Sequence, residues 1–111
     1  MYYFAYGSNM KHSRLEERVK RHGLAWKIGF LEGYCLCFNK IRGNDSAYAN
    51  ITNRSGSSVW GVLYQLTNAE LDLLDEYEGV EKHHYIRITK VIRNAEGSYN
   101  ADVYIANGNM V

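Results

Sequence analysis

The C-terminal third of the chain constrains the fold most strongly, because it contains two alternating segments joined by a short turn. Residues Tyr85 to Ile92 and Tyr99 to Ala106 alternate between apolar and polar side chains, which is the period-two pattern of a half-buried strand. Between them, Asn94-Ala95-Glu96-Gly97 has the composition of a tight turn. The pattern predicts an antiparallel hairpin, so the fold must include an antiparallel sheet.

Earlier segments also have the composition of strands, and turn residues divide them. Gly29 and Gly33 interrupt one long β-like segment and predict breaks or bulges in it. A polar loop is predicted over residues 39–46, and the Ser- and Gly-rich residues 53–58 predict the turn of a second hairpin. The predicted strands cover residues 2–6, 25–38, 48–52 and 59–66.

Two capping patterns predict two helices. Ser13-Arg14-Leu15-Glu16 has the form of a capping box and predicts a short helix over about residues 11–21, which Gly23 would end. Thr67-Asn68-Ala69-Glu70 has the same form and opens a second helix, which Gly79 would end. Because strands outnumber helices and hairpins join most of them, we expect an α+β fold built on an antiparallel sheet or a small barrel.

Length and charge limit the number of domains and the kinds of partner. With 111 residues, 46% of them hydrophobic, we expect one domain that spans residues 1–111. The 13 basic and 12 acidic residues leave a net charge of +1, so the chain lacks the excess of positive charge that is typical of proteins that bind nucleic acid or an anionic membrane. Basic residues between Lys11 and Lys27 are interrupted by acidic ones, so we interpret them as a solvated helix face.

The sequence predicts a cytoplasmic protein, and its cysteines and adjacent histidines do not form a metal site. No apolar stretch reaches the length of a membrane span, and residues 11–21 are charged where a signal peptide would be apolar. Cys35 and Cys37 are two apart and share one strand face, where a mutual disulfide is awkward, so we interpret them as core or strand thiols. His83 and His84 are adjacent and would point to opposite faces of a strand, so they cannot chelate one metal ion.

The N-terminal segment Tyr3-Phe4-Ala5-Tyr6-Gly7-Ser8-Asn9-Met10 is the first candidate functional feature. An apolar strand runs directly into a turn in which Gly7 can adopt backbone angles closed to other residues. Ser8 and Asn9 can expose backbone N–H groups to a ligand or cap a following helix. The turn is either an anion receptor or an ordinary strand–turn–helix corner.

Glu78 is the second candidate, because its place on the predicted helix is unusual for a carboxylate. At 100° per residue, Glu78 falls between Leu71 and Leu74, inside the apolar stripe, whereas Asp72 and Glu76 fall on the wet face. A carboxylate aimed at a core is costly unless it is solvated at a pocket or used there. The alternative is that the helix frays before Glu78 and leaves it on the surface.

These residues together resemble the gamma-glutamylcyclotransferase family, which includes the gamma-glutamylamine cyclotransferases and the AIG2-like proteins. The resemblance runs in order from residue 2 to about residue 106, and its most specific elements are the Tyr-Gly-Ser-Asn turn and the Leu-Asp-x-x-Glu-Gly-Val pattern. The matching segments are Tyr3-Phe4-Ala5-Tyr6-Gly7-Ser8-Asn9-Met10, Tyr48-Ala49-Asn50-Ile51, Val59-Trp60-Gly61-Val62-Leu63-Tyr64, Leu74-Asp75-Glu76-Tyr77-Glu78-Gly79-Val80 and Tyr85.

The resemblance implies a small mixed, mainly antiparallel β-barrel flanked by short helices. It implies an enzyme that cyclises a gamma-glutamyl amine or dipeptide to 5-oxoproline, by an acyltransferase- or lyase-type intramolecular aminolysis, and releases the amine or amino acid. Glu78 is the implied catalytic acid/base, and neither metal nor cofactor takes part. The implied substrate-binding residues are Tyr3, Phe4, Ala5, Tyr6, Gly7, Ser8 and Asn9, with Tyr85; Tyr85 and Arg87 either line the leaving-group side or are ordinary strand residues.

One departure from the family leaves other functions open. Members of the family continue beyond the strand that matches Tyr99 to Ala106, whereas this sequence stops at Val111. The pocket is then more open, or another subunit completes it, or the sequence is a fragment. The alternative function is a non-catalytic module of the same fold that binds a small ligand; binding of single-stranded nucleic acid by the tyrosines and the basic helix is a third hypothesis. The sequence gives no indication of an oligomeric state.

Overall fold

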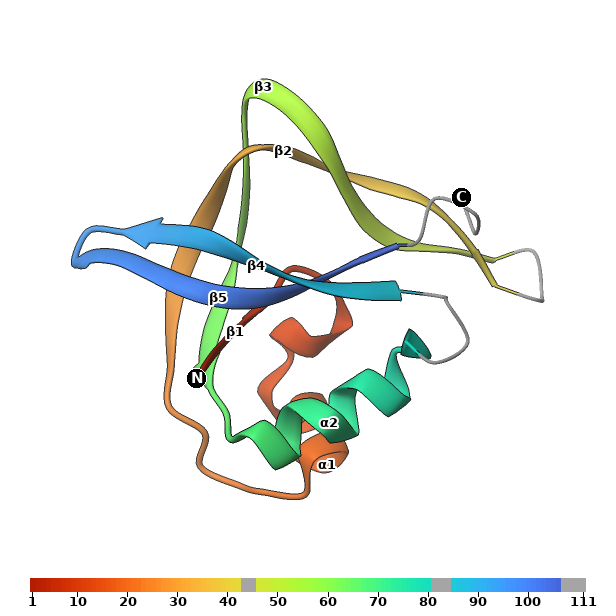
Figure 1. The fold of residues 1–111 in the computed structure, drawn as a ribbon, viewed down its shortest axis with the longest axis vertical. Helices are drawn as coiled ribbons and strands as arrows, with labels where there is room; N and C mark the ends of the chain where they lie inside the picture. Colours follow the sequence, from red (N-terminus) through yellow and green to blue (C-terminus); the bar gives the residue numbers. More distant parts are fainter. Residues whose placement is uncertain (43–45, 81–84, 107–111) are drawn as a thin grey trace.

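Five strands of the described chain close into a barrel, and two helices lie together at one end of it (Figure 1). The structure is a computed structural model that describes residues 1–42, 46–80 and 85–106. In the barrel order β1-β3-β2-β4-β5, the β1–β5 pair is parallel and the other neighbours are antiparallel. The prediction of an α+β, mainly antiparallel barrel is confirmed. The strands are β1 (Tyr2–Ala5), β2 (Trp26–Arg42), β3 (Ser46–Gln65), β4 (Tyr85–Asn94) and β5 (Gly97–Ala106).

The predicted turn at residues 53–58 is wrong, because this segment stays within β3. Asn53 pairs with Tyr34 and Ser58 pairs with Glu32, so residues 54–57 of β3 lie opposite the single residue Gly33 of β2. Both strands bend sharply here, at the top of the view in Figure 1. The predicted strands at 48–52 and 59–66 are therefore parts of one long strand with a wide bulge.

The connection between β2 and β3 falls elsewhere than predicted. β2 continues to Arg42 and β3 begins at Ser46, so most of the loop predicted over 39–46 is strand, and residues 43–45 lie outside the described residues. The bulge predicted at Gly33 is confirmed by a register shift and a φ of 83°. Gly29 is no bulge: it pairs regularly with Gly61, and a Cβ there would lie 2.8 Å from Ile92 Cγ2. A glycine at this position lets β4 approach β2 closely.

The second predicted helix begins as expected. In α2 (Asn68–Tyr77) the Thr67 side chain accepts a hydrogen bond from Glu70 N, and Thr67 N donates to Glu70 Oε1 at 2.8 Å. This is the reciprocal capping box that the sequence predicts. Leu71 and Leu74 are buried, whereas Asp72 and Glu76 are exposed, so the angular assignment of the helix faces is confirmed.

The first predicted helix begins and ends differently. A short 3₁₀ helix, η1 (Ser8–Met10), precedes α1 (His12–Val19), so the turn at Gly7 does not run directly into the α-helix. The capping box predicted at Ser13 is wrong: the N-cap is Lys11, and the Glu16 carboxylate accepts hydrogen bonds from Gly23 N and Leu24 N. Lys20, with a φ of 61°, ends the helix before Gly23.

The buried residues form two clusters on opposite faces of the barrel wall. Consecutive residues of β1 contribute to each in turn, since strand side chains alternate between faces. The barrel interior contains Phe4, Tyr6, Leu31, Ile51, Val59, Leu63, Ile92, Ala101 and Val103. The helix-covered core lies between the wall and the two helices and contains Tyr3, Ala5, Leu15, Val19, Leu24, Val62, Tyr64, Leu66, Leu71, Leu74, Tyr85, Tyr104 and Ala106.

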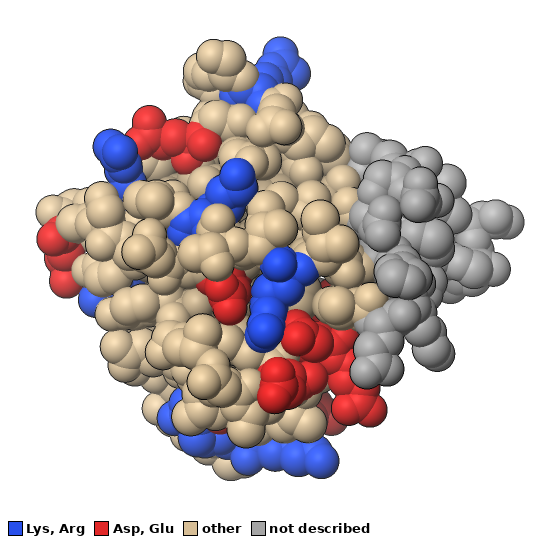
Figure 2. Space-filling view, viewed as in Figure 1, with Lys and Arg blue, Asp and Glu red and all other residues tan. Residues whose placement is uncertain are grey.

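Surface charge and the cysteines agree with the sequence patterns. Figure 2 shows basic and acidic side chains intermingled on the face drawn, with carboxylates gathered over α2. Cys35 and Cys37 are free thiols of β2. In the described ranges, neither helix has the length and apolar character needed to cross a bilayer.

Candidate functional site

A cavity of about 150 Å³ opens where the end of β1 meets the two helices. It is smaller than the pockets of about 300–1,000 Å³ that hold drug-sized ligands, and it suits a ligand of amino-acid size. Its walls come from β1, η1, α1, β3, β4, β5 and the last turn of α2. The lining residues are Tyr3, Tyr6, Gly7, Asn9, Arg18, Ala49, Tyr77, Glu78, Tyr85 and Tyr104.

The structure brings most of the predicted site residues to this cavity. Glu78 and Gly7, more than 70 positions apart in the sequence, share it, and Tyr85 faces it from β4. The other predicted residues that line it are Tyr3, Tyr6 and Asn9.

Three predicted binding residues stand apart from these. Phe4 packs in the barrel interior, because alternation along β1 turns it away from Tyr3. Ala5 is buried in the helix-covered core. Ser8 belongs to η1, and its side chain lies outside what the structure describes. Their part in substrate binding stays a prediction.

Glu78 reaches the cavity because the helical turn continues through it. It is the C-cap of α2, with φ −79° and ψ −3°, and its backbone N–H donates to Leu74 O at 2.7 Å. Glu78 therefore lies on the helix face that contains Leu71 and Leu74, as the 100° spacing predicts, and its side chain is half-buried. Gly79 then turns the chain with a φ of 68°, a value that favours glycine.

A hydrogen-bonded chain fixes the floor of the cavity to α1. Asn9 Nδ2 donates to the Tyr3 hydroxyl at 2.9 Å, and Arg18 Nη1 donates to Asn9 Oδ1 at 2.5 Å. Asn9 is 3% exposed, so its amide has left water almost completely, and these bonds give both its nitrogen and its oxygen a partner. The turn itself is closed by a bond from Met10 N to Gly7 O. The sequence predicts Asn9 as a helix cap or as part of an anion receptor, whereas its side chain bonds to Tyr3 and Arg18.

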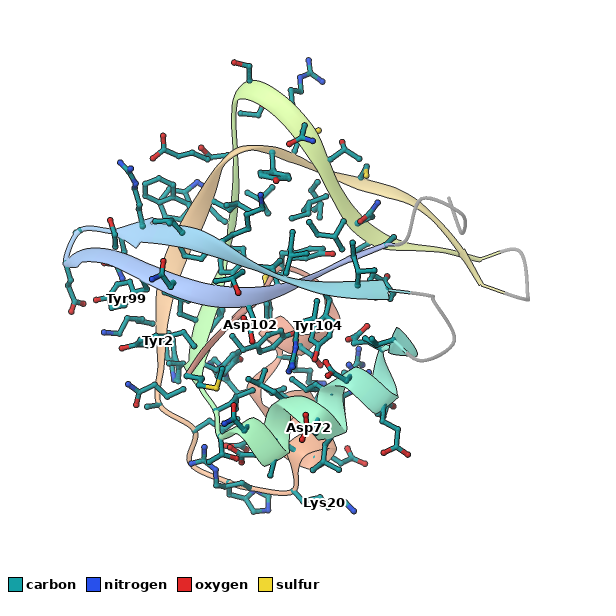
Figure 3. The ribbon with its side chains drawn as sticks, viewed as in Figure 1. Tyr2, Lys20, Asp72, Tyr99, Asp102 and Tyr104 are labelled. Carbon is teal, nitrogen blue, oxygen red and sulfur yellow. The ribbon has the colours of Figure 1, made fainter. Side chains whose placement is uncertain are left out.

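Tyrosine hydroxyls form the opposite wall. Tyr104 points from β5 toward α2 (Figure 3), where its hydroxyl donates to Asp75 Oδ1 at 2.6 Å. The Tyr6 hydroxyl donates to Tyr104 O, and the Tyr85 hydroxyl donates to Ala49 O at 3.0 Å. Asp75 also lies 3.4 Å from Arg87 Nε, so Arg87 supports the Tyr104 contact from behind the cavity wall rather than lining the cavity.

The surroundings keep these hydroxyls protonated. Burial raises the pKa of Tyr3 and of Tyr6 far above the usual value, and the nearby Glu78 charge raises both further. The Arg18 charge acts in the opposite direction on the pKa of Tyr3. Burial and the bond to Asp75 raise the pKa of Tyr104 in the same way. The three groups are therefore neutral hydroxyls at physiological pH.

Four residues that line the cavity are not among those that the sequence predicts for the site: Arg18, Ala49, Tyr77 and Tyr104. The interpretation of the basic residues between Lys11 and Lys27 as a solvated helix face is wrong for Arg18, which is half-buried and lines the cavity. It holds for Arg21, which is exposed and pairs with Glu70 at 2.6 Å. The sequence does contain an indication of the position of Arg18. Arg18 is three residues after Leu15 and next to Val19, both buried, so it borders the apolar face of α1.

Within the described part of the chain, no group of three or more His, Cys, Asp or Glu side chains is placed to hold a metal ion. His83 and His84 lie outside the described residues. Among the described residues that line the cavity, the polar side-chain groups are the Arg18 guanidinium, the Glu78 carboxylate, the Asn9 amide and the tyrosine hydroxyls.

A family model described as gamma-glutamyl cyclotransferase, AIG2-like, matches residues 3–110. The chain belongs to this family. The gamma-glutamylcyclotransferases of Homo sapiens and Bos taurus are 32% and 31% identical to it over 100 residues, which is 86% of this chain and 53% of each relative. This cyclotransferase-family chain thus spans about half the length of the curated relatives it matches.

The fold also matches solved structures of the family. A structure described as gamma-glutamyl cyclotransferase superposes with a TM-score of 0.85 at 28% identity, over 96% of this chain and 66% of the other. The family that the sequence resembles is therefore the family to which the chain belongs, and the barrel with its two helices is the fold of a cyclotransferase relative.

Proposed function

We propose that the chain is a gamma-glutamylcyclotransferase that converts a gamma-glutamyl amine or dipeptide to 5-oxoproline and releases the amine or amino acid. The observation that carries the proposal is the shared cavity of Glu78 and the Tyr3–Asn9 segment. Family membership supports it, as does the size of the cavity, which suits a glutamyl group. We propose that residues 1–111 act as one domain in this reaction, without a metal or cofactor.

The reaction needs no nucleophile from the protein. The α-amine of the glutamyl group attacks its own γ-carbonyl carbon, a new C–N bond closes the five-membered ring, and the bond to the departing amine breaks. Holding the two reacting groups together contributes about 7–11 kcal/mol in well-oriented intramolecular reactions. The closed floor of the cavity, where Asn9 fixes Tyr3 and Arg18, supports such an orientation.

Glu78 is the proposed proton carrier. The α-ammonium is unreactive while charged, so the Glu78 carboxylate first accepts a proton from it. After the ring has closed, the same carboxyl donates a proton to the nitrogen of the departing amine. The second proton of the former ammonium also passes to that nitrogen, so that a neutral lactam and an ammonium product leave. The half-buried place of Glu78 on the cavity wall supports this role.

Backbone N–H groups at Gly7 and Ser8 are the proposed donors to the developing oxyanion. Gly7 lines the cavity, and a glycine there keeps the backbone accessible to a ligand. One such donor contributes about 2.7–4 kcal/mol to transition-state stabilisation in enzymes of acyl transfer. The neutral hydroxyls of Tyr3 and Tyr6, together with the Tyr85 side chain, complete the proposed binding surface.

The test is production of 5-oxoproline from a panel of gamma-glutamyl amines and gamma-glutamyl dipeptides. We expect Glu78→Gln to lower kcat about 10²- to 10⁴-fold, because the amide cannot carry the proton, while 5-oxoproline still binds. Asp72→Asn is the matched control, since Asp72 lies on the exposed face of the same helix (Figure 3).

The outcomes separate the two candidate functions. Turnover at the wild-type rate in Glu78→Gln would remove Glu78 from the mechanism. Calorimetric binding of 5-oxoproline with no turnover of any gamma-glutamyl compound would favour the non-catalytic binding module. The identity of the best substrate in the panel decides between an amine and an amino acid as the leaving group.

A further inference from the structure

Arg18 is the cation among the described residues that line the cavity, and it faces the same space as the Glu78 carboxylate. It reaches this space from α1, whereas Glu78 reaches it from the last turn of α2. A small cavity with one positive and one negative side chain is electrostatically complementary to a zwitterion. An α-amino acid group, with an ammonium and a carboxylate on one carbon atom, has this charge pattern.

The guanidinium of Arg18 is held in a defined orientation. Nη1 donates to Asn9 Oδ1, and the guanidinium carbon lies 4.1 Å from the centre of the Tyr77 ring. A cation above an aromatic face is attracted to it, which restricts the directions in which the guanidinium N–H groups point. Since a guanidinium has five N–H donors, it can serve Asn9 and further acceptors at once. Paired donors in one plane are suited to a carboxylate.

The two charged groups also act on one buried group of the cavity. Both Arg18 and Glu78 act electrostatically on the buried hydroxyl of Tyr3, one lowering its pKa and the other raising it. A ligand beside Tyr3 therefore experiences both charges. The ammonium end of an amino acid group is attracted toward Glu78 and the carboxylate end toward Arg18.

On the basis of the proposed cyclotransferase function, we infer that Arg18 binds the α-carboxylate of the gamma-glutamyl group. This contact fixes the α-carbon so that the amine points toward Glu78 and can reach the γ-carbonyl. It also makes the site selective for substrates whose glutamyl α-carboxylate is free. Asn9 and Tyr77 are then positioning residues, because they act on the ligand through Arg18.

Binding of the cyclic product tests the inference without requiring turnover. Calorimetry compares 5-oxoproline, which has the carboxylate, with 5-oxoprolinamide, which lacks its charge. We expect Arg18→Gln to weaken binding of 5-oxoproline about 10- to 100-fold, the effect of losing a charge-assisted hydrogen bond, and to leave binding of the amide unchanged. Equal effects on both ligands, or no effect on either, would overturn the inference.

Arg14→Gln is the matched control. Arg14 is exposed one helical turn before Arg18, so its removal changes the net charge by the same amount near the site. We expect both ligands to bind to this variant as to the wild type. If Arg14→Gln weakened 5-oxoproline binding as much as Arg18→Gln does, the effect would come from the change in net charge near the site rather than from a direct contact. That result would overturn the inference.

A kinetic arm shows which carboxylate Arg18 binds. A dipeptide substrate such as gamma-glutamylalanine has a second carboxylate on its leaving group, whereas gamma-glutamylethylamine has none. We expect Arg18→Gln to reduce kcat/KM by the same factor for both substrates. A reduction confined to the dipeptide would place the contact on the leaving group and overturn the assignment to the glutamyl end.

Folding is checked by the thermal midpoint of each variant, because Arg18 also bonds to Asn9 and stacks on Tyr77. Should Arg18→Gln not fold, Arg18→Lys keeps the charge but loses the planar fork; we expect it to weaken 5-oxoproline binding by a smaller factor and the amide not at all. The two proposals fail differently. Carboxylate-dependent binding without turnover contradicts the enzyme but not Arg18, and turnover with no difference between acid and amide contradicts Arg18 alone.

Discussion

The barrel interior and the helix-covered core lie on the two sides of one wall, and they differ in chemistry. The interior is almost entirely aliphatic and aromatic, with Tyr6 as its one tyrosine among the buried residues of the cluster. The helix-covered core has four, and each hydroxyl has a partner: Tyr3 accepts from Asn9, Tyr64 contacts His12, Tyr85 donates to Ala49 O and Tyr104 donates to Asp75.

The difference follows from where the cavity opens. A fully dry interior gains most from apolar side chains in close contact, because an unpaired hydroxyl there would be costly. A core that borders a polar cavity can use tyrosines, whose rings pack while their hydroxyls bond to the site. Stability should therefore depend on shape in the first cluster and on hydroxyl bonding in the second.

Phe4 gives the largest expected effect and tests the shape-dependent side. It is 1% exposed, and its ring fills the space left by the missing side chain of Gly61. We expect Phe4→Ala to lower the free energy of unfolding by about 3–5 kcal/mol, measured by urea denaturation. Tyr3→Phe, one residue away on the other face, removes only a hydroxyl and should cost about 1 kcal/mol. Equal losses would show that the two faces are not distinct.

High pH gives the next largest effect, and it should act on the tyrosine-rich side. Burial raises the pKa of Tyr64 from 10.0 to about 12, and burial raises the pKa of Tyr3 and Tyr104 as well. Since the folded-state pKa exceeds the unfolded one, this contribution to stability is complete below the unfolded pKa of about 10. It is lost as the pH rises through the folded-state values.

Urea midpoints measured between about pH 9 and pH 11.5 check this expectation. We expect them to fall steeply above about pH 10, and Tyr64→Phe to make the fall less steep because one titrating group is gone. The comparison uses the slope of the urea midpoint against pH, so a loss of stability that is the same at every pH, such as that from the missing bond to His12, does not affect it. An unchanged slope in Tyr64→Phe would show that this hydroxyl does not resist ionisation in the folded protein.

The parts of the fold that local chemistry determines were predictable from the sequence. The hairpin of β4 and β5 follows from two strand-like segments around a short turn, and it pairs from Tyr85↔Ala106 to Asn94↔Gly97. The capping box at Thr67 fixes the start of α2, and a helical wheel then places Glu78 at the cavity. Each of these depends on neighbours within a few residues.

The failures share a different cause. Residues 53–58 have the composition of a turn, but the closure of the barrel keeps them in a strand, where a wide bulge uses the same Ser and Gly residues. Arg18 lies among charged neighbours in the sequence, and the packing of α1 against η1 and α2 turns it to the cavity. Local composition cannot distinguish these outcomes, because contacts between distant segments decide them.

Glu70 gives the smallest expected effect and tests how the helix layer is held. Its side chain is buried at the start of α2, where it accepts hydrogen bonds from Arg21 Nε at 2.6 Å, Arg21 Nη2 at 3.0 Å and Thr67 N at 2.8 Å. The bond from Arg21 is the main reason that the pKa of Glu70 lies below its usual value. Because the folded-state pKa is the lower one, this stability is present above the unfolded pKa of about 4.5 and is lost as the pH falls below it.

We expect Glu70→Gln to cost about 1 kcal/mol at neutral pH, a modest value because Arg21 is 45% exposed and water screens the pair. The variant should also lose less stability than the wild type between about pH 5 and pH 3 in urea denaturation. Glu17→Gln changes an exposed residue of α1, so its free energy of unfolding should stay within about 0.5 kcal/mol of the wild-type value. It should also lose as much stability as the wild type between about pH 5 and pH 3. If Glu70→Gln keeps the full acid dependence, other carboxylates hold the helices to the barrel. The polar contacts that hold α2 to the barrel would then lie nearer the cavity, where Asp75 contacts Tyr104 of β5 and Arg87 of β4.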